Sequence, residues 1–246
     1  MKFYVLTIFP ELMETLLRSS ILGRAEKNGF LDFHVLNIRD YSTDRHKKTD
    51  DYPYGGGAGM VMTAQPVYDA YEAARKEIGG PVRTIYLTPA AKVFTQKDAK
   101  AYAKEEALIL LCGHYEGVDQ RVLDEIVTDE ISIGDYVLTG GEPAAWVLID
   151  AISRMVPGVL TNETSGEQES LEGGLLEYPQ YTRPELWRDH RVPEILLSGD
   201  HAKVDAWRRD QAILKTKAVR PELLAEAELT TKERARFLSE PPSHDA

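Results

Sequence analysis

A short apolar run that ends in a glycine turn decides the fold: Ala107-Leu108-Ile109-Leu110-Leu111-Cys112-Gly113-His114-Tyr115-Glu116-Gly117. Consecutive apolar residues that stop at a glycine are typical of a strand buried on both faces of a parallel sheet. A helical pattern over residues 118–125 follows. Ligands of open α/β sheets bind where strands end and helices begin, so this turn is expected at a binding edge.

Strand and helix patterns alternate on both sides of this run. The other expected strands are residues 2–8, 32–37, 82–88 and 130–133, and the other expected helices are residues 11–26, 66–78, 96–105 and about 142–155. Thr95 with Asp98 is expected to cap the helix that begins at residue 96, because a hydroxyl accepts from an unpaired amide and an acid favours the helix start. The alternation predicts an α/β fold with a mostly parallel sheet covered on both faces.

The chain is expected to divide into three parts. Residues 1–157 form the first domain, because Pro157-Gly158 ends the alternating pattern. Residues 158–184 carry many carboxylates and no periodicity, which is typical of a long linker or lid. Residues 185–246 form a small helical domain with helices over 200–217 and 230–238, the second started by Thr230 with Glu233.

Composition indicates a folded protein of the cytoplasm. Among its 246 residues 43% are apolar, enough for a real core. The longest apolar run, residues 107–112, is far below the roughly 20 residues that span a bilayer, so no membrane helix is expected. The single cysteine, Cys112, excludes an internal disulfide and is expected to be a core residue.

The charge is acidic and unevenly distributed. Lysine and arginine number 29 against 40 aspartate and glutamate, a formal net charge of -11. This balance argues against broad, sequence-independent coating of nucleic acid. Yet residues 203–220 hold six basic and two acidic residues, whereas residues 163–177 hold five glutamates and no basic residue. The sequence is therefore compatible with a local basic surface in residues 203–220.

Three glycine-bearing segments are candidates for chemistry: residues 53–62, 112–121 and 131–143. The first lacks the lysine and hydroxyl of a phosphate-binding loop, and a plain turn is as good a reading of it as a binding loop. The second and third each follow an expected strand and precede an expected helix. Both loops are therefore expected at the carboxyl edge of the sheet, where they could converge on one pocket.

These segments resemble those of the bacterial tRNA (guanine-N1)-methyltransferases, a family of the SPOUT class with a deep trefoil knot. The resemblance runs from Met1 to about Leu224 and is most specific at Gly-Asp-Tyr-Val-Leu-Thr-Gly-Gly-Glu, residues 134–142. Tyr181-Thr182-Arg183-Pro184 and Leu196-Leu197-Ser198-Gly199-Asp200-His201 point to this family rather than to its relatives. The resemblance implies a SPOUT-type knotted sheet, a small helical C-terminal domain and methylation of guanosine at N1, at tRNA position 37.

The resemblance also implies a bound S-adenosylmethionine, with Mg²⁺ as a helper whose ligands the sequence does not identify. The cofactor residues it implies are Tyr86, Leu87, Pro89, Gly113, Glu116, Ser132, Ile133, Gly134, Asp135, Tyr136, Val137, Leu138, Gly140 and Gly141. Glycines suit such a site because backbone amides and carbonyls can then approach a purine edge. The sequence departs from the family at Ala90-Ala91, where relatives have Gln-Gly, and alanine fits there only if φ stays negative.

Two residues are implied to be catalytic. Guanine N1 carries a proton at neutral pH, so methylation needs a base. The family's aspartate before a serine corresponds here to Glu169 before Ser170, a departure that adds one methylene. Arg154 matches the arginine that supports charge on guanine O6. The plainer readings are a solvated acid for Glu169, with Glu167 as its nearest rival, and a helix-end cation for Arg154.

The remaining implied contacts concern tRNA and a second chain. The substrate residues are Gly59, Glu177, Arg183, Arg188, His190 and Ser198. Candidate cations for phosphates are Arg39, Arg45, His46, Lys47, Lys48, Arg183, Arg188, Arg191, Arg208, Arg209, Lys215 and Lys217. The family works as a homodimer with shared sites. Two other classes stay open: a SPOUT enzyme that methylates a ribose hydroxyl or a ribosomal base, and an RNA-binding module without activity.

Overall fold

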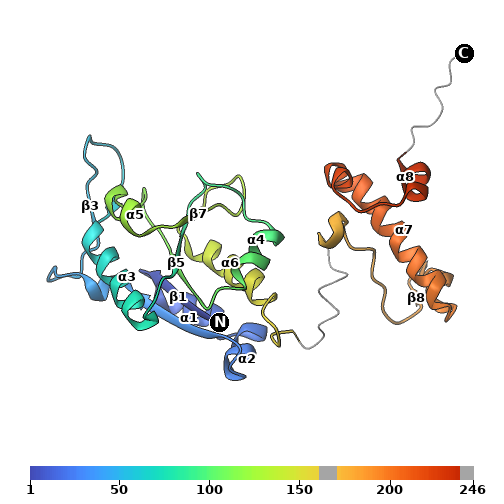
Figure 1. The fold of residues 1–246 in the computed structure, drawn as a ribbon, viewed down its shortest axis with the longest axis horizontal. Coiled ribbons are helices and arrows are strands. Elements are labelled where there is room, and N and C mark those ends of the chain that lie inside the picture. Colours follow the sequence, from blue (N-terminus) through green and yellow to red (C-terminus); the bar gives the residue numbers. More distant parts are fainter. Residues whose placement is uncertain (161–170, 239–246) are drawn as a thin grey trace, which may run out of the picture. The chain divides into compact units, whose positions relative to one another are not determined.

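The computed structural model describes residues 1–160 and 171–238. They belong to two compact units, Met1–Thr161 and Asn162–Ala246, and Figure 1 shows the elements of each. No helix in the described ranges is long and apolar enough to cross a membrane.

The first unit is built on a five-stranded sheet in the order β2-β1-β6-β5-β7. Its strands are β1 (Lys2–Thr7), β2 (Asp32–Asn37), β5 (Arg83–Leu87), β6 (Ala107–Leu111) and β7 (Asp129–Ile131). Every neighbouring pair is parallel. The expected α/β fold with a mostly parallel sheet is confirmed.

Alternate residues of each strand enter different cores, because successive side chains of a strand point to opposite faces. Phe3 and Val5 lie in a core with helices α1 (Pro10–Leu17), α2 (Ser20–Lys27), α4 (Gln96–Tyr102) and α6 (Glu142–Ser153). Tyr4 and Leu6 lie in the other core, with α3 (Ala64–Ile78), α5 (Gln120–Ile126) and the short helix η1 (Ile38–Tyr41). Cys112 is fully buried in the first core, as expected.

The single helix expected over residues 11–26 is wrong, because the structure has two helices with a break at Arg18 and Ser19. The Ser19 hydroxyl donates to the Leu16 carbonyl oxygen at 2.8 Å, and Ser20 has φ 49°. Serine side chains that bond the local backbone compete with helical hydrogen bonds. The run of polar residues therefore ends α1 although the apolar spacing continues.

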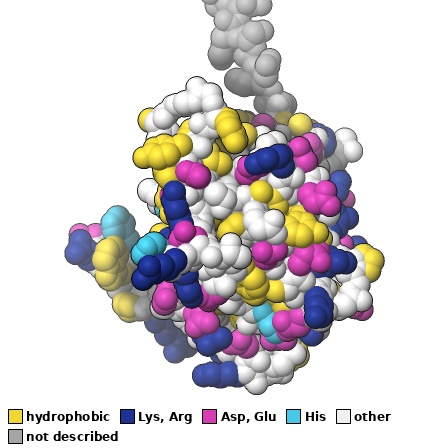
Figure 2. All heavy atoms as spheres, turned by 90° about the vertical axis from the view of Figure 1, so that its left-hand side faces the viewer, with side chains coloured by type: hydrophobic (Ala, Val, Ile, Leu, Met, Phe, Trp, Pro, Cys, Tyr) yellow, Lys and Arg dark blue, Asp and Glu magenta, His cyan; other side chains and the backbone are white. Residues whose placement is uncertain are grey.

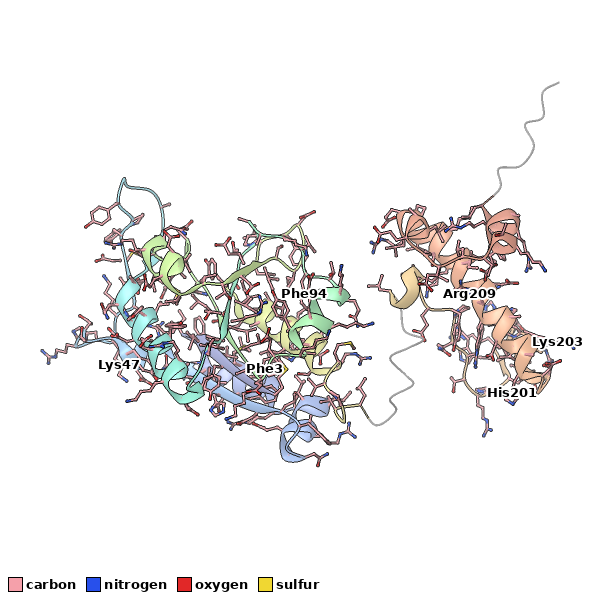
Figure 3. All side chains as sticks on the ribbon, in the orientation of Figure 1. Phe3, Lys47, Phe94, His201, Lys203 and Arg209 are labelled. Carbon is pink, nitrogen blue, oxygen red and sulfur yellow. The ribbon has the colours of Figure 1, made fainter. Side chains whose placement is uncertain are left out.

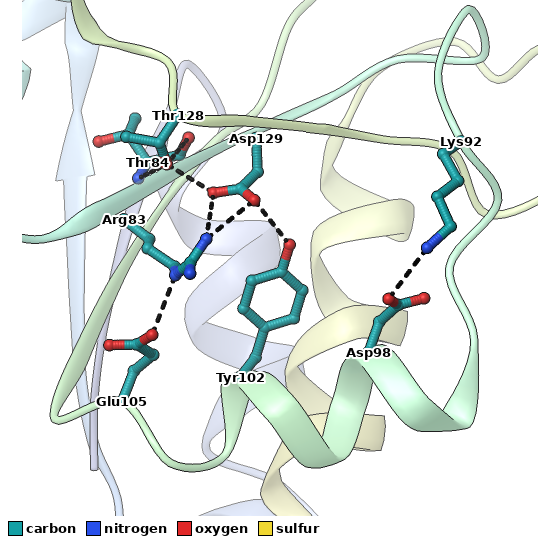
Figure 4. A network of polar contacts seen from close by, with 8 residues as sticks. All are labelled: Arg83, Thr84, Lys92, Asp98, Tyr102, Glu105, Thr128 and Asp129. Carbon is teal, nitrogen blue, oxygen red and sulfur yellow. Dashed lines mark hydrogen bonds and ion pairs between the residues drawn. The ribbon is translucent and has the colours of Figure 1, made fainter.

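Charged side chains hold the amino ends of β5 and β7 together (Figure 4). Asp129 accepts hydrogen bonds from Arg83 at 3.1 Å and from the Tyr102 hydroxyl of α4 at 3.1 Å. Burial, followed by the charge of Asp129, raises the pKa of Tyr102 to about 12. This cluster lies at the end of the sheet opposite the strand ends that carry the glycine turns.

A two-stranded ribbon, β3 (Asp50–Asp51) with β4 (Val61–Met62), closes the base of the first glycine segment. Alternating apolarity did not reveal it, because each strand has only two residues. The Thr63 N–H also donates to the Thr49 carbonyl oxygen at 2.9 Å. The ribbon fixes both ends of the loop over residues 52–60.

The second unit packs around one long helix, α7 (His201–Val219), with α8 (Thr231–Phe237) and the hairpin β8 (Leu186–Trp187) and β9 (His190–Arg191). The short helices η3 (Glu172–Gly174), η4 (Glu194–Leu197) and η5 (Pro221–Ala225) complete it. Its core contains Leu175, Ala212, Ile213, Leu224, Ala227 and Phe237. Leu175 lies in the segment expected as a linker, but its side chain packs in the core of the second unit.

Candidate functional site

The fold brings the three glycine segments side by side. The Gly141 N–H donates to the Gly113 carbonyl oxygen at 2.8 Å, which joins the second and third segments. The Glu116 N–H donates to the Met60 carbonyl oxygen at 3.0 Å, which joins the second to the first. All three therefore meet at the carboxyl edge of the sheet, as the strand–turn–helix order predicts for the second and third.

Glycine is required at two of these junctions. A Cβ on Gly141 would lie 2.8 Å from the Cα of Cys112, and a Cβ on Gly59 would lie 2.4 Å from the Glu116 carboxylate. Gly59 also has φ 85°, a conformation that other residues rarely adopt. The close approach of the loops therefore depends on the missing side chains.

A small pocket of about 40 Å³ opens where β5 and β7 end. Its lining is apolar side chains and loop backbone: Leu87, Thr88, Pro89, Ile131, Ser132, Ile133, Gly134, Tyr136, Leu138 and Ala144. The expected cofactor residues that line this pocket are Leu87, Pro89, Ser132, Ile133, Gly134, Tyr136 and Leu138. Thr88, Ile131 and Ala144 were not among the expected cofactor residues, although Ile131 belongs to the third glycine segment and Ala144 directly follows it.

The turn after β7 shapes this pocket. The Ser132 hydroxyl accepts from the Gly134 N–H at 3.1 Å and contacts the Gly134 carbonyl oxygen at 3.0 Å. Gly134 has φ 145°, and a Cβ there would lie 2.6 Å from the ring of Tyr136. Asp135 and Val137 are exposed and lie outside the lining. The turn therefore holds Tyr136 and Leu138 over the pocket while their neighbours face solvent.

The pocket is smaller than a nucleoside-sized ligand, since ligand pockets usually measure about 300–1,000 Å³. Tyr136 and Leu138 are 54% and 41% exposed, so both can move without disturbing the core. The buried wall, which includes Leu87 and Ile131, stays in place. Apolar side chains beside accessible backbone suit a purine, which needs flat apolar contact and hydrogen bonds at its edge.

Sequence reasoning missed a buried polar pair beneath the site. The Thr7 hydroxyl donates to Glu142 Oε1 at 2.7 Å, and the two residues are 0% and 2% exposed. Thr7 ends β1 and Glu142 begins α6, where the helix dipole favours a negative charge. Burial, followed by the charge of Glu142, raises the pKa of the Cys112 thiol well above its usual value. Cys112 therefore stays a protonated core side chain.

Arg154 follows the last residue of α6, and its backbone N–H donates to the Asp150 carbonyl oxygen at 3.1 Å. The side chain is half-buried. Glu169 and Glu167, the expected base and its rival, lie outside the described residues.

The expected substrate residues of the second unit lie in four places. Arg183 lines a pocket, Arg188 and His190 belong to the β8–β9 hairpin, and Ser198 precedes α7. Trp187 of this hairpin stacks on His190 at 6.4 Å and lies beneath the Arg188 guanidinium at 4.8 Å. Glu177 accepts a hydrogen bond from Gln180 at 2.7 Å.

Many of the candidate phosphate-binding cations have acidic or carbonyl partners. Lys47 pairs with Asp40, Arg191 with Glu185 and Arg209 with Glu233, and Lys215 donates to the Glu177 carbonyl oxygen. On the face that Figure 2 shows, Lys and Arg side chains lie among Asp and Glu. Such mixed charge does not produce the broad attraction that a continuous basic face would exert on a nucleic acid.

Within residues 1–160 and 171–238, no group of three or more His, Cys, Asp or Glu side chains is placed to hold a metal ion.

A parallel sheet with a pocket at its carboxyl edge defines a protein of the α/β class. The family model described as "tRNA (Guanine-1)-methyltransferase TrmD" matches residues 1–226, and the chain belongs to this family.

Curated relatives agree over nearly the whole length. A tRNA (guanine-N(1)-)-methyltransferase of Caldicellulosiruptor saccharolyticus is 58% identical over 97% of this chain and 96% of its own. The proteins of the same name from Lachnoclostridium phytofermentans and Clostridioides difficile are 50% and 54% identical, over 98% and 91% of this chain and 96% and 97% of theirs.

Proposed function

We propose that this protein transfers a methyl group from S-adenosylmethionine to N1 of guanosine at tRNA position 37, giving N1-methylguanosine and S-adenosylhomocysteine, in the cytoplasm. The methylation of guanine N1 in tRNA rests on membership of the TrmD family over residues 1–226. The observation that carries the choice of site is the pocket at the ends of β5 and β7, which the third glycine segment lines and beside which hydrogen bonds hold the second and first segments.

The residues around the pocket fit an adenosyl group once Tyr136 and Leu138 move outward. Leu87, Ile133 and Leu138 supply the apolar surface for the base, and the backbone around Gly134 can reach its edge. Gly140, beside His114 and Glu142, belongs to the same loop and is a further proposed cofactor residue. The cofactor supplies an electrophilic methyl group on a sulfonium. Tyr86, Gly113, Glu116, Asp135, Val137 and Gly141 complete the proposed cofactor residues.

Glu169 acts as the base in this proposal. Its carboxylate takes the proton from guanine N1, so that the nitrogen lone pair can attack the methyl carbon. The guanidinium of Arg154 donates hydrogen bonds to guanine O6, where negative charge develops as the proton leaves. Gly59, Glu177, Arg183, Arg188, His190 and Ser198 contact the tRNA.

The position of Arg154 supports a site shared between two chains. The pocket borders the first turn of α6 at Ala144, whereas Arg154 follows the last turn. A helix of 12 residues is roughly 18 Å long, too far for an arginine side chain to reach back. Arg154 therefore serves the pocket of a partner subunit.

An exposed apolar face on α6 supports the same dimer. Trp146 and Val147 are 37% and 41% exposed, and residues 143, 146, 147, 150 and 154 share one side of a helix. Leu12 of the neighbouring α1 is 47% exposed. A second copy that covers this face would receive Arg154 at its edge.

The path of the third glycine segment supports a knot. Phe94 N–H donates to the Ser132 carbonyl oxygen at 2.8 Å on one side, and Gly140 bridges to His114 on the other. The third segment is thus in contact with the loops that follow both β5 and β6, which is where the proposed trefoil knot would form. In the proposed organisation residues 1–157 bind the cofactor, residues 158–184 form the lid and residues 185–246 bind tRNA.

Labelled methyl transfer to two tRNA transcripts tests this function. We expect transfer to a transcript with guanosine at position 37, none to its adenosine counterpart, and N1-methylguanosine in the digest. Methylation of a ribose or of another base would place the protein among other RNA methyltransferases. Binding of tRNA without any transfer would leave only an RNA-binding module.

The same assay tests the base. Glu169→Gln is expected to lose at least about 100-fold in the transfer rate, since removal of a general base costs about 10²–10⁴-fold. Glu169→Asp keeps the carboxylate and should retain more activity than Gln. Unchanged transfer in Glu169→Gln would move the base to another residue, with Glu167→Gln as the next variant.

A further inference from the structure

The second unit contains a large pocket of its own, with a volume of about 890 Å³. One wall is the segment over residues 178–185, and the other walls come from Val192, Leu196, Leu197, Val204, Trp207 and Arg208. All of these residues belong to the second unit, so the pocket exists without a contribution from the first. Its size is in the range of small-molecule sites.

Aromatic rings form part of the walls. The Tyr181 and Trp207 rings are 6.4 Å apart and inclined by 53°, so neither ring covers the face of the other. Tyr181 is 49% exposed, and Trp207 is half-buried and not part of the core of this unit. Rings held in this way offer flat surfaces on which a planar group can stack.

An incompletely paired arginine lies next to these rings. The Arg208 guanidinium lies 5.1 Å over the Tyr178 ring, and Nη1 contacts Asp205 Oδ1 at 3.3 Å. Arg208 Nε is buried and has no hydrogen-bond acceptor among the described residues. The cation is therefore positioned by stacking, and its side chain is 38% exposed, so the guanidinium can also contact a ligand.

The surrounding charge favours RNA over an apolar ligand. Arg183 and Arg208 line the pocket, and the acidic lining residue Glu185 pairs with Arg191, so the lining is positive. Lys203 and Arg209 of the same helix α7 (Figure 3) are paired with Asp200 and Glu233. Aromatic faces beside arginines are the usual means of binding an unstacked nucleobase. A base-paired nucleotide is stacked on both sides, so only an unpaired nucleotide can enter.

We propose that this pocket, formed by Tyr178, Tyr181, Trp207 and Arg208, binds one unpaired nucleobase of the tRNA anticodon loop other than the methylated guanine. The proposal rests on the proposed tRNA substrate and adds a second point of base recognition. The second unit then recognises the anticodon loop through a base contact as well as through its phosphates.

Binding of anticodon stem-loops with single abasic positions tests the pocket. The full-length protein is titrated into a fluorescent stem-loop, and fluorescence anisotropy gives Kd for the intact RNA and for each loop position made abasic in turn. One position besides 37 should weaken binding by about tenfold, which corresponds to the loss of one base-stacking contact.

Trp207→Leu identifies that position. The variant should bind the intact stem-loop about tenfold more weakly and lose its sensitivity at that one position only. Leu214→Ala, an exposed apolar residue of the same helix outside the pocket, should behave like the native protein. Tyr181→Leu should reproduce Trp207→Leu and serves in its place if Trp207→Leu unfolds.

Equal losses for the native protein and both pocket variants at every abasic position would overturn the pocket while leaving the methyl transfer intact. Binding with the expected single sensitivity, but no methyl transfer, would overturn the proposed function and leave the pocket. The two failures are distinguishable because anisotropy requires no turnover.

Discussion

At the scale of single residues, the site depends on buried contacts as much as on the groups that face the ligand. Thr7 and Glu142 join the end of β1 to the start of α6 by a hydrogen bond of 2.7 Å. The Thr7 hydroxyl also accepts from the Phe9 N–H at 2.9 Å. No periodicity reveals such a pair, because its members are far apart in the chain and each alone looks like an ordinary polar residue.

Thr7→Val should therefore destabilise the protein strongly. The change keeps the side-chain shape and leaves the buried Glu142 carboxylate without this donor, at a cost of about 2 kcal/mol in unfolding free energy. Urea unfolding followed by circular dichroism measures it. Thr15→Val, at an exposed position where the hydroxyl bonds only the Glu11 carbonyl oxygen, is the control and should cost far less.

Backbone dihedral angles decide whether alanine fits at Ala90 and Ala91, where relatives have Gln-Gly. Among the described residues, the non-glycine positions with positive φ are Ser20, Lys47, Tyr115, Leu171 and Arg188. Ala90 and Ala91 are thus in the backbone region that alanine prefers, so this loop needs no glycine.

Ala91→Gly should accordingly bring no benefit. Glycine increases the freedom of the unfolded chain, which lowers the unfolding free energy by about 0.5–1 kcal/mol. Denaturant unfolding checks this value, and calorimetry with S-adenosylmethionine checks the affinity. A variant that is more stable, or that binds the cofactor much more tightly, would mean that alanine strains the loop.

At the scale of elements, local chemistry predicted the helix starts well. The capping boxes at Thr95 with Asp98 and at Thr230 with Glu233 are both present, because they depend only on residues three apart. The break after α1 and the two-residue strands β3, β4, β8 and β9 were not predictable, because polar side chains or distant pairing override the local pattern. The aromatic pocket was missed because Tyr181 and Trp207 come from separate segments.

Glu233 links the start of α8 to α7 and makes the second unit sensitive to acid. The hydrogen bond from Arg209 lowers the pKa of Glu233 from 4.5 to about 2. A lowered pKa in the folded state stabilises the fold above pH 4.5, and this stabilisation is lost as the pH falls from 4.5 towards 2.

Glu233→Gln should thus lower the melting temperature at pH 7, and its difference from the native protein should narrow as the pH falls below 4.5. Thermal unfolding across this pH range measures the difference. Glu222→Gln, which removes a pair with Arg220 at the surface, should cause no measurable change. If the difference in melting temperature between Glu233→Gln and the native protein does not depend on pH, the variant acts through packing and not through the charge of Glu233.

At the scale of the whole molecule, the alternation of strands and helices was enough to predict the parallel sheet and its binding edge. The alternation was not enough to predict the strand order β2-β1-β6-β5-β7, because each strand is apolar enough to occupy several positions in the sheet. The proposed sharing of a site by two chains could not be predicted from local patterns either, because it depends on surfaces. Arg154 and the pocket occupy opposite ends of α6, and the proposed dimer would bring the Arg154 of one chain to the pocket of the other.

Methyl transfer by mixed dimers tests this account most directly. Arg154→Ala and Leu138→Arg are each expected to be inactive, the second because it places a charged side chain over the pocket. Equal mixing followed by exchange of subunits should restore about a quarter of the native activity, since half of the dimers then hold one intact site of two. A mixture as inactive as either variant alone would mean that Arg154 does not act on the partner's pocket, and would contradict the shared site.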